Sequence, residues 1–504
     1  MSVRPLGVAP SVRRTTVLAV VAALALALGG FGLARAGSGL TTRHLTVDGV
    51  PLTEVRGGPA TGRRPGVVIA HGFAGSARLM RPLADTVARQ GAVALLLDFA
   101  GHGANPARLP GAGRDSGSSR ATLEHDLDVA VAHLRALPDV DPSRIVLVGH
   151  SMGAGAVTRY AAGHPEIART VAISLPDAGD LPYGRPRSLV LVVGGAEFPD
   201  FRAAAEAAAR AAPAGERTVV VVPATEHISV LFARRTHETA AGAVPGAHGP
   251  PPRPTDRLTA AGLLLLGLMV GFVPLAGVLL RPGRRDRARA GPRWRWPLVA
   301  SAAAVLGVAV AGVLPTTRLP LAVGGYVTGF LLLTGVLLAA APTVLRTPRP
   351  VRAPEPVRAP EPVRAPVPAP VAAALLTGYA LVAVAVPIHL GLTSAAPVGA
   401  RWWLLPVVAA GCLVFLLGAE RAADGRSWRY AAVGGIAVLV LAAAAVLGRA
   451  PGFVLLVVPL FAVLVGWQAA WAAVLRRAGA PPWLPALVGA ALLAWPVATT
   501  LPLG

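Results

Sequence analysis

The chain has no lysine, and all 47 of the basic side chains among its 504 residues are arginine. Since only 25 residues are acidic, the formal net charge is +22. A nucleic-acid-binding domain would gather such an excess on its own surface. Residues 37–257 instead carry 23 arginines against 20 acidic residues, so the excess lies elsewhere in the chain. This distribution argues against nucleic acid as a partner.

Cysteine is also nearly absent. Cys412 is the single cysteine, so an intrachain disulfide is excluded. Histidine, cysteine and carboxylate side chains do not recur at the spacing of a metal site. The nearest group, Glu124-His125-Asp126, lies in an expected helix, where consecutive residues point in different directions. We therefore expect neither a metal nor any other cofactor.

Long apolar runs are abundant in the second half. The chain is 54% hydrophobic with a mean hydropathy of +0.59, which indicates a membrane protein. Ionisable side chains are lacking deep inside these runs, whereas an ion-coupled transporter usually needs them along its path. The expected spans are 258–280, 297–314, 319–341, 371–391, 402–418, 430–448, 452–474 and 482–502.

Arginines are distributed unequally between the two sides of these spans. One set of short segments carries Arg4, Arg13 and Arg14, seven arginines in Arg281–Arg295, five in Arg346–Arg364, three in Arg421–Arg429, and Arg476-Arg477. The opposite loops carry Arg318, Arg401 and Arg449. Because cytoplasmic loops of membrane proteins are enriched in basic residues, the pattern predicts a cytoplasmic N-terminus. It places residues 37–243 and the C-terminus outside the cytoplasm, in a multi-pass protein of the cell membrane.

The first apolar run, Val17–Leu33, has two interpretations. Ala34-Arg35-Ala36 offers small residues for cleavage of a signal peptide, and the run is also long enough for an uncleaved anchor. Residues 1–36 are therefore assigned to a signal or anchor segment. Either way, the following segment leaves the cytoplasm.

Residues 37–243 alternate between strand and helix patterns, which predicts an α/β domain with a mostly parallel sheet. We expect the remainder to be a linker at 244–257, three transmembrane helices at 258–341, a linker at 342–370 and five transmembrane helices at 371–504. The second linker repeats Val-Arg-Ala-Pro-Glu-Pro within Val351–Pro368, which favours a stiff, extended chain. The expected strands are Val67–Ala70, Ala92–Leu97, Ile145–Val148, Thr170–Ser174, Leu189–Val193 and Thr218–Val222, and the expected helices are Leu79–Gln90, Ser119–Leu137, Met152–Gly163 and Asp200–Ala212.

Four motifs each follow an expected strand. They are His71-Gly72-Phe73, the segment Asp98–Gly103, the pentapeptide Gly149-His150-Ser151-Met152-Gly153, and a late histidine, His227. Small residues at both ends of a G-x-S-x-G pentapeptide let a strand turn sharply into a helix and expose the serine. Carboxyl ends of parallel strands meet at one sheet edge, so these motifs are expected to lie together.

In this combination the chain resembles the α/β-hydrolase family over about Arg43 to Ala241. The resemblance implies Ser151 as nucleophile, His227 as general base, and the N–H groups of Phe73 and Met152 as oxyanion hole. Membrane-embedded bacterial members are known by fold alone, so no particular substrate is implied.

A general base of this kind needs an acidic side chain to orient it, and the sequence leaves three carboxylates as candidates. Glu197 has the family spacing after a glycine, although the family's usual acid there is aspartate. Asp200 and Asp177 are the alternatives, and Asp200 could instead cap a helix. His71 and His102 are expected to shape loops, and Asp98 to be a structural carboxylate at a strand end. His150 and Met152 are expected to contact the acyl pocket or its wall. Only Leu175–Arg187 separates two of the strands, too little for a helical cap, so we expect a capless, open site.

The sequence thus predicts a membrane-bound, extracytoplasmic serine hydrolase of ester-like bonds, with an acyl-ester or lipid-like substrate and the lipid bilayer as partners. The alternative is a transporter or exporter component whose hydrolase-like domain only binds.

Overall fold

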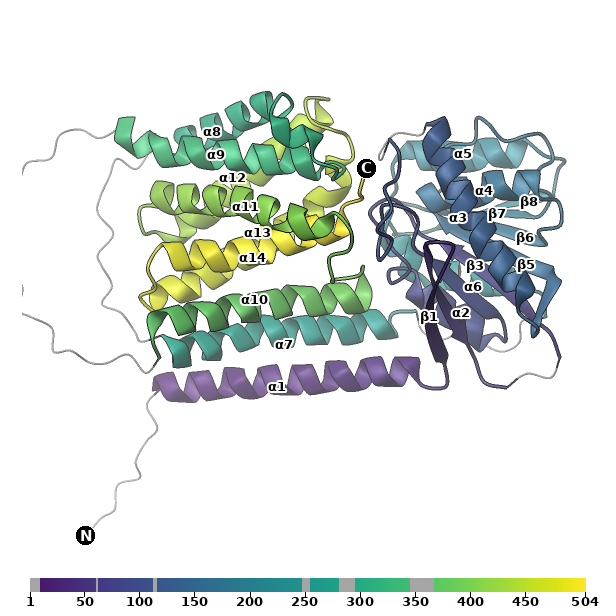
Figure 1. Cartoon of the computed structure of the whole chain (residues 1–504), viewed down its shortest axis with the longest axis horizontal. Coiled ribbons are helices and arrows are strands. Elements are labelled where there is room, and N and C mark those ends of the chain that lie inside the picture. The colour runs from purple at the N-terminus through teal and green to yellow at the C-terminus, as the bar shows by residue number, and fades with distance from the viewer. Residues whose placement is uncertain (1–9, 60–61, 112–115, 247–253, 281–294, 345–366) are drawn as a thin grey trace, which may run out of the picture. The chain divides into compact units, whose positions relative to one another are not determined.

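The computed structural model describes residues 10–59, 62–111, 116–246, 254–280, 295–344 and 367–504 (Figure 1). The chain divides into two compact units. One comprises residues 27–264 together with 386–402 and 499–504, and the other comprises 1–26, 265–385 and 403–498. The expected linker repeat at Val351–Pro368 and most of the arginines of Arg281–Arg295 and Arg346–Arg364 lie outside the described residues, as does Arg4.

The first unit is built on an eight-stranded sheet with the order β1-β2-β4-β3-β5-β6-β7-β8. β1 pairs antiparallel with β2, and β2 pairs antiparallel with β4, whereas every pair from β4 onward is parallel. The strands are β1 (Thr41–Val47), β2 (Val50–Arg56), β3 (Arg64–Ala70), β4 (Val93–Leu97), β5 (Val140–His150), β6 (Arg169–Ile173), β7 (Leu189–Gly194) and β8 (Arg217–Val222).

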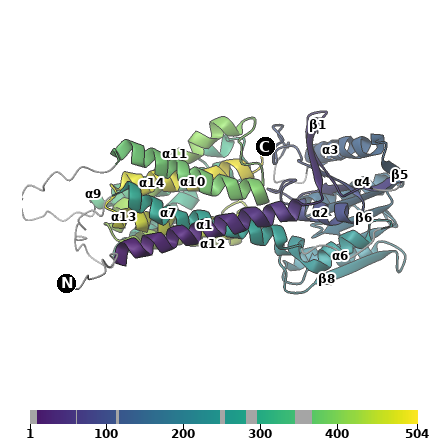
Figure 2. The same cartoon turned by 90° about the horizontal axis from the view of Figure 1, so that it is seen from below.

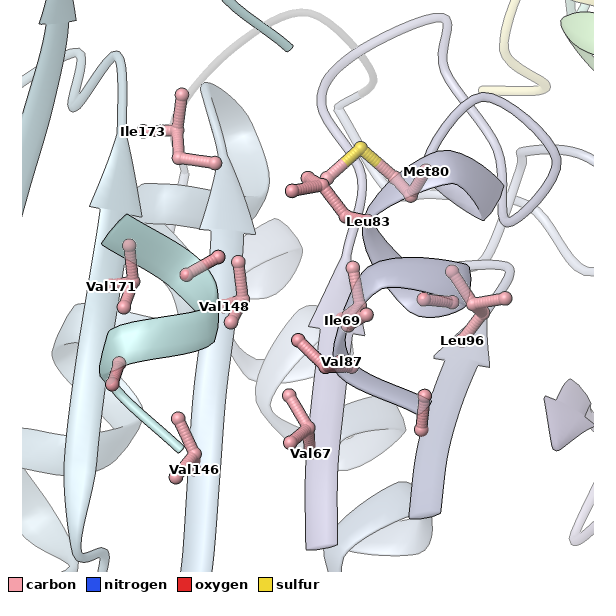
Figure 3. Packing of buried hydrophobic residues seen from close by; sticks show 14 of the residues in the cluster. Val67, Ile69, Met80, Leu83, Val87, Leu96, Val146, Val148, Val171 and Ile173 are labelled. Atoms are coloured by element: carbon pink, nitrogen blue, oxygen red, sulfur yellow. The ribbon is translucent and has the colours of Figure 1, made fainter. Parts of the chain in front are cut away.

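Hydrophobic side chains alternate between the two faces of the sheet because successive residues of a strand point to opposite sides. In β3, Val67 and Ile69 belong to one core cluster, and Val68 and Ala70 to the other. Figure 3 shows the first cluster, in which Val67 and Ile69 face Leu83 and Val87 of a covering helix. Both faces are therefore buried, as a parallel sheet requires.

Five helices cover these two faces. α2 (Arg81–Arg89) and α6 (Arg234–Gly242) pack on one face, and α3 (Gly117–Ala136), α4 (Met152–Gly163) and α5 (Pro199–Arg210) pack on the other. Figure 2 shows α3 and α6 on opposite sides of the sheet. α2 is amphipathic: its buried apolar residues recur at helical spacing, and its first turn carries a proline. The connections therefore place every β–α turn of β3, β5 and β7 at one edge of the sheet.

The six expected strands are present as β3–β8 and the four expected helices as α2–α5, with shifted ends. The antiparallel hairpin β1–β2 and the short helix α6 were not expected. β1 is largely exposed and reads Thr-Thr-Arg-His-Leu-Thr-Val, so it lacks the apolar run that marked the buried strands. Residues 174–188, all of them described, contain no helix between β6 and β7, so the domain is capless there.

The second unit is helical, and close packing of small residues holds its helices together. Gly335 of α9 (Gly324–Val344) lies against Gly418 of α11 (Arg401–Ala423). A Cβ added to Gly335 would lie 2.5 Å from backbone atoms of Phe415. Backbones can approach so closely only where glycine leaves room. The Phe272 ring of α7 (Asp256–Leu279) stacks on Trp471 of α13 (Val454–Arg477) with centroids 3.9 Å apart.

Each of the eight expected C-terminal spans coincides with a helix, α7 to α14. The remaining ones are α8 (Arg295–Ala311), α10 (Ala369–Gly391), α12 (Ser427–Val446) and α14 (Trp483–Thr500), and the N-terminal run lies in α1 (Pro10–Gly37). Among the described residues, eight helices are long and apolar enough to cross a membrane, α1 included, whereas α8 is shorter. The length and composition of these helices are compatible with a multi-pass membrane protein.

The expected span ends differ from the observed helix ends by a few residues, and the two largest differences, at 319 and at 418, amount to five residues. The span expected from residue 319 begins instead at Gly324, because a 3₁₀ turn, η2 (Pro315–Arg318), precedes it. The span expected to end at 418 continues to Ala423. The added turn carries Glu420, which forms a bidentate ion pair with Arg476 through contacts of 2.7 and 3.1 Å. The pairing lets both charged side chains be buried at the helix ends.

Candidate active site

Ser151 stands at the sharp turn between β5 and α4. Its backbone has φ 53° and ψ −117°, a strained conformation that turns the chain abruptly. A Cβ on Gly153 would lie 2.5 Å from the His71 carbonyl oxygen, and one on Gly149 would collide with the Gly153 carbonyl. The glycines of the pentapeptide are therefore required by close backbone approach, and the turn leaves the Ser151 hydroxyl partly exposed.

His227 bridges the serine and a carboxylate. Its Nδ1 lies 2.8 Å from Glu197 Oε1, and its Nε2 lies 3.0 Å from Ser151 Oγ. A carboxylate only accepts hydrogen bonds, so Nδ1 carries the hydrogen and Nε2 accepts from the serine hydroxyl. This is the tautomer in which the imidazole can take the serine proton.

Two loops fix Glu197 against His227. The Gly194 N–H donates to the second carboxylate oxygen of Glu197 at 2.9 Å. The loops after β7 and β8 are joined as well, because the Gly195 and Ala196 N–H groups donate to the carbonyls of Val222 and Thr225 at 2.8 and 2.9 Å. The Glu197 side chain is only 1% exposed, so its orientation is determined by these partners.

The structure brings Glu197, and neither alternative carboxylate, to the histidine. Asp200 is exposed in the first turn of α5. Asp177 is also exposed and accepts a hydrogen bond from the Gly179 N–H at 3.0 Å. The longer glutamate reaches His227 from the loop position that the family usually fills with aspartate.

His150, expected to contact the acyl pocket or its wall, is 2% exposed. Its Nε2 donates to the His227 backbone carbonyl at 2.9 Å, and the two rings lie 4.8 Å apart. Burial, with His227 adding to it, lowers the pKa of His150 to about 3, so the ring is neutral. The sequence offered no signal for this bond, which joins residues 77 positions apart.

The loops after β3 and β4 form one hydrogen-bonded body beside the serine. Asp98 accepts from the N–H groups of Ala77 and Ala104 at 2.7 and 2.9 Å, and His71 Nε2 accepts from the Phe99 N–H at 3.1 Å. Burial lowers the pKa of His71, and that of His102 falls well below its usual value for the same reason. These bonds agree with the expected loop-shaping role of His71 and His102, and with the structural role expected of Asp98 at the end of β4.

Met152 is next to the nucleophile in the chain, and Phe73 lies in the loop after β3 that approaches it in space. Met152 begins α4 directly after Ser151. Phe73 follows Gly72, whose added Cβ would lie 3.0 Å from Ser151 Cβ. No group of three or more histidine, cysteine, aspartate or glutamate side chains able to hold a metal ion occurs among the described residues.

A family model described as serine aminopeptidase, S33, matches residues 62–212, which include the elbow, the loops after β3 and β4, and Glu197. Together with the strand order and the elbow geometry, this match identifies the fold of the sheet domain. The sheet domain has the α/β-hydrolase fold.

The relatives of this chain are distant. It is 32% identical over 125 residues to uncharacterized proteins Rv2307c and MT2364 of Mycobacterium tuberculosis, a match that covers 24% of this chain and 41% of each relative. Among solved structures, a dienelactone hydrolase from Anabaena variabilis is 20% identical, with 40% of this chain and 95% of that chain covered and a TM-score of 0.33. A soluble variant of monoglyceride lipase from Saccharomyces cerevisiae is 14% identical, with 41% and 96% covered and a TM-score of 0.32.

Proposed function

We propose that this protein is a membrane-bound serine hydrolase that cleaves ester-like bonds through an acyl-enzyme. The observation that carries the proposal is the continuous chain of hydrogen bonds from Glu197 through His227 to Ser151, with the serine on a strained elbow. A serine needs a base within hydrogen-bond distance to become a nucleophile, and that base needs an acid to orient it.

In the proposed reaction, Ser151 Oγ attacks the substrate carbonyl carbon while its proton passes to His227 Nε2. Glu197 stabilises the imidazolium that forms. The carbonyl oxygen becomes an oxyanion, which the N–H groups of Phe73 and Met152 bind. Collapse expels the leaving group, which takes the proton from His227, and leaves an acyl-serine. Water, deprotonated by His227, then hydrolyses the acyl-serine and restores the hydroxyl.

Carboxylic esters, lipid esters and thioesters are the proposed substrates, with amides as the nearest competitor, since the matching family model is described by a peptidase. The absence of a helix in residues 174–188 supports an open site suited to acyl groups on bulky substrates or at a membrane surface. The arginine asymmetry between loops supports an extracytoplasmic site.

The test is labelling of membranes with a fluorophosphonate, which reacts with an activated serine. Wild-type protein should be labelled, Ser151→Ala should not, and His227→Ala should be labelled far more slowly. Ser118→Ala and His125→Ala are matched controls, because both side chains are exposed on α3, away from the triad, and should leave labelling unchanged. A folded wild-type protein that resists the probe would refute catalysis and favour the alternative of a transporter or exporter component with a binding domain.

Two further measurements refine the proposal. Purified protein in detergent would be assayed with 4-nitrophenyl esters of increasing acyl length and with aminoacyl 4-nitroanilides, and faster turnover of the anilides would refute the preference for esters. A membrane-impermeant fluorophosphonate on intact cells should label the protein as fully as after permeabilisation. Labelling only after permeabilisation would refute the extracytoplasmic location.

A further inference from the structure

Two segments distant in sequence belong to the same compact unit as the sheet. They are residues 386–402, which connect α10 to α11, and residues 499–504, which follow α14. The second pairs with the loop after β4 as a strand would: the Leu503 N–H donates to the Gly101 carbonyl at 2.8 Å, and the Leu109 N–H donates to the Leu503 carbonyl at 2.9 Å.

Gly101 shows how close this approach is. Its φ is +78°, and a Cβ at this position would collide with the Leu503 carbonyl oxygen. Glycine is therefore required at this position of the β4 loop both for the backbone conformation and for the space that Leu503 occupies.

Arg401 binds the same loop from the other segment. Its Nη2 donates to the carbonyls of Gly101 and Leu501 at 2.8 and 3.2 Å, and the residue is 1% exposed. A guanidinium is seldom buried without partners, because its desolvation is unfavourable. Arg401 therefore holds the backbone at Gly101 and the backbone at Leu501 close to each other.

The loop after β3 is held in the same way by residues near the end of α10. Ser76 Oγ donates to the Leu392 carbonyl at 2.7 Å, and Arg78 Nη1 donates to the His389 carbonyl at 2.9 Å. Leu392 also packs against the core cluster of the sheet. Both loops beside the nucleophile thus depend on residues beyond position 386.

A short path leads from Arg401 to the proposed oxyanion hole. Gly101, whose carbonyl Arg401 binds, is followed by His102, and the His102 ring contacts the Phe73 ring edge to face with centroids 5.8 Å apart. His102 also lies against His71, with centroids 5.1 Å apart. A shift of Gly101 would therefore move the ring that supports Phe73.

We propose that Arg401 is a positioning residue of the hydrolase, and that Arg401 and the segment around Leu503 hold the loops after β3 and β4 so that Phe73 can present its N–H to the oxyanion. This inference rests on the proposed function. It gives one role to residues 386–402 and 499–504: residues 37–243 alone do not make a competent site.

The experiment compares full-length wild type, Arg401→Gln, Arg401→Lys and a chain lacking Leu503 and Gly504, all in detergent. Since loss of one oxyanion donor lowers kcat by about a hundredfold to a thousandfold, misplacing a donor should slow fluorophosphonate labelling by roughly tenfold or more. Arg401→Lys, which keeps the charge and donors, should restore part of the rate. Arg449→Ala is the matched control, because Arg449 is an exposed arginine of another interhelical loop.

Kinetics and exchange separate positioning from general stability. We expect kcat for an ester to fall in Arg401→Gln with KM little changed, because the oxyanion exists only after attack. In the chain that lacks Leu503 and Gly504, hydrogen exchange should increase in peptides that contain Leu109, because the Leu109 amide is bonded to Leu503 in the full chain. The thermal midpoint of this variant should remain that of the wild type.

If Arg401→Gln and the shortened chain are labelled as fast as the wild type, the inference is overturned and the proposed function stays intact. Equal exchange at Leu109 in the shortened chain would overturn it as well. An unreactive wild type would refute the proposed function, and the exchange measurement would then still test whether residues 401 and 503 hold the loop.

Discussion

His150 and His227 are joined by a hydrogen bond from a side chain to a backbone: His150 Nε2 donates to the His227 carbonyl oxygen at 2.9 Å. The residue before the nucleophile thus holds the loop that carries the base. Because β5 is central in the sheet, this bond fixes the β8 loop against a central strand of the domain.

Replacing His150 with leucine should slow labelling of Ser151 by about tenfold, because one buried hydrogen bond contributes roughly 1–1.5 kcal/mol and the carbonyl would lose its donor. His150→Gln retains an N–H donor of similar reach and should be slowed less. Labelling rate constants, with thermal midpoints measured in parallel, check this. Equal rates for wild type and His150→Leu would show that the β8 loop is held without this bond.

Glu197→Gln should lower kcat for an ester by about a thousandfold to ten-thousandfold, because an amide can present its N–H to the histidine and so stabilise the wrong tautomer. Asp200→Asn and Asp177→Asn should stay within about twofold of wild type, since both carboxylates are exposed and neither contacts His227. Steady-state kinetics on the three variants measure the contrast. A large loss in Asp200→Asn with an active Glu197→Gln would reassign the acid.

The elements that carry the site could be read from the sequence because they are local. β3 to β8 are apolar runs bounded by turns, and the elbow of Ser151 follows from glycines within the same pentapeptide. Because the serine, the acid and the histidine each follow a strand of a parallel sheet, their three loops could be placed at one sheet edge. The acid itself stayed open among three carboxylates, because its choice depends on reach across a loop, and only the bonds of Glu197 to Gly194 and His227 decide it.

Other features could not be predicted, since they join residues far apart or lack a pattern. β1 is an exposed strand with few apolar residues, so it resembles a loop. Arg401 counted only as one of few arginines on its side of the spans, yet it binds a carbonyl 300 positions away. Such partners arise from tertiary packing, which hydrophobic periodicity does not encode.

The elbow should tolerate no side chain at Gly153. In Gly153→Ala the added Cβ would lie 2.5 Å from the His71 carbonyl oxygen, so the backbone must shift and the free energy of unfolding should fall by about 1–3 kcal/mol. Gly163→Ala, at the end of the same helix, meets nothing within 4 Å and should be neutral or stabilise by a few tenths of a kcal/mol, up to about 1. Pulse proteolysis in urea on the detergent-solubilised chain would measure both. Similar losses in the two variants would show that helix propensity, not backbone contact, governs the site.

Acidification should destabilise the sheet domain, because burial shifts the pKa values of several of its side chains. Burial lowers the pKa of His150 to about 3 and that of His237 to about 4, both below the usual 6.5. Between about pH 4 and 6 the unfolded chain binds two protons at these positions that the native state does not. Burial raises the pKa of Asp126 to about 6, so there the native state holds one proton that the unfolded chain releases.

These three groups leave a balance of one proton in favour of the unfolded state, and the buried His71 and His102, whose pKa values are also lowered, act in the same direction. The free energy of unfolding should therefore fall by at least about 1.4 kcal/mol per pH unit as pH decreases from 6 towards 4. His237→Gln should reduce that slope by about 1.4 kcal/mol per pH unit, because it removes one of the histidine protons that the unfolded chain takes up. The exposed His125 offers the matched control, since His125→Gln should keep the wild-type slope. Pulse proteolysis across this range gives the slope directly, and stability that rises on acidification would contradict the neutral, buried state of both histidines.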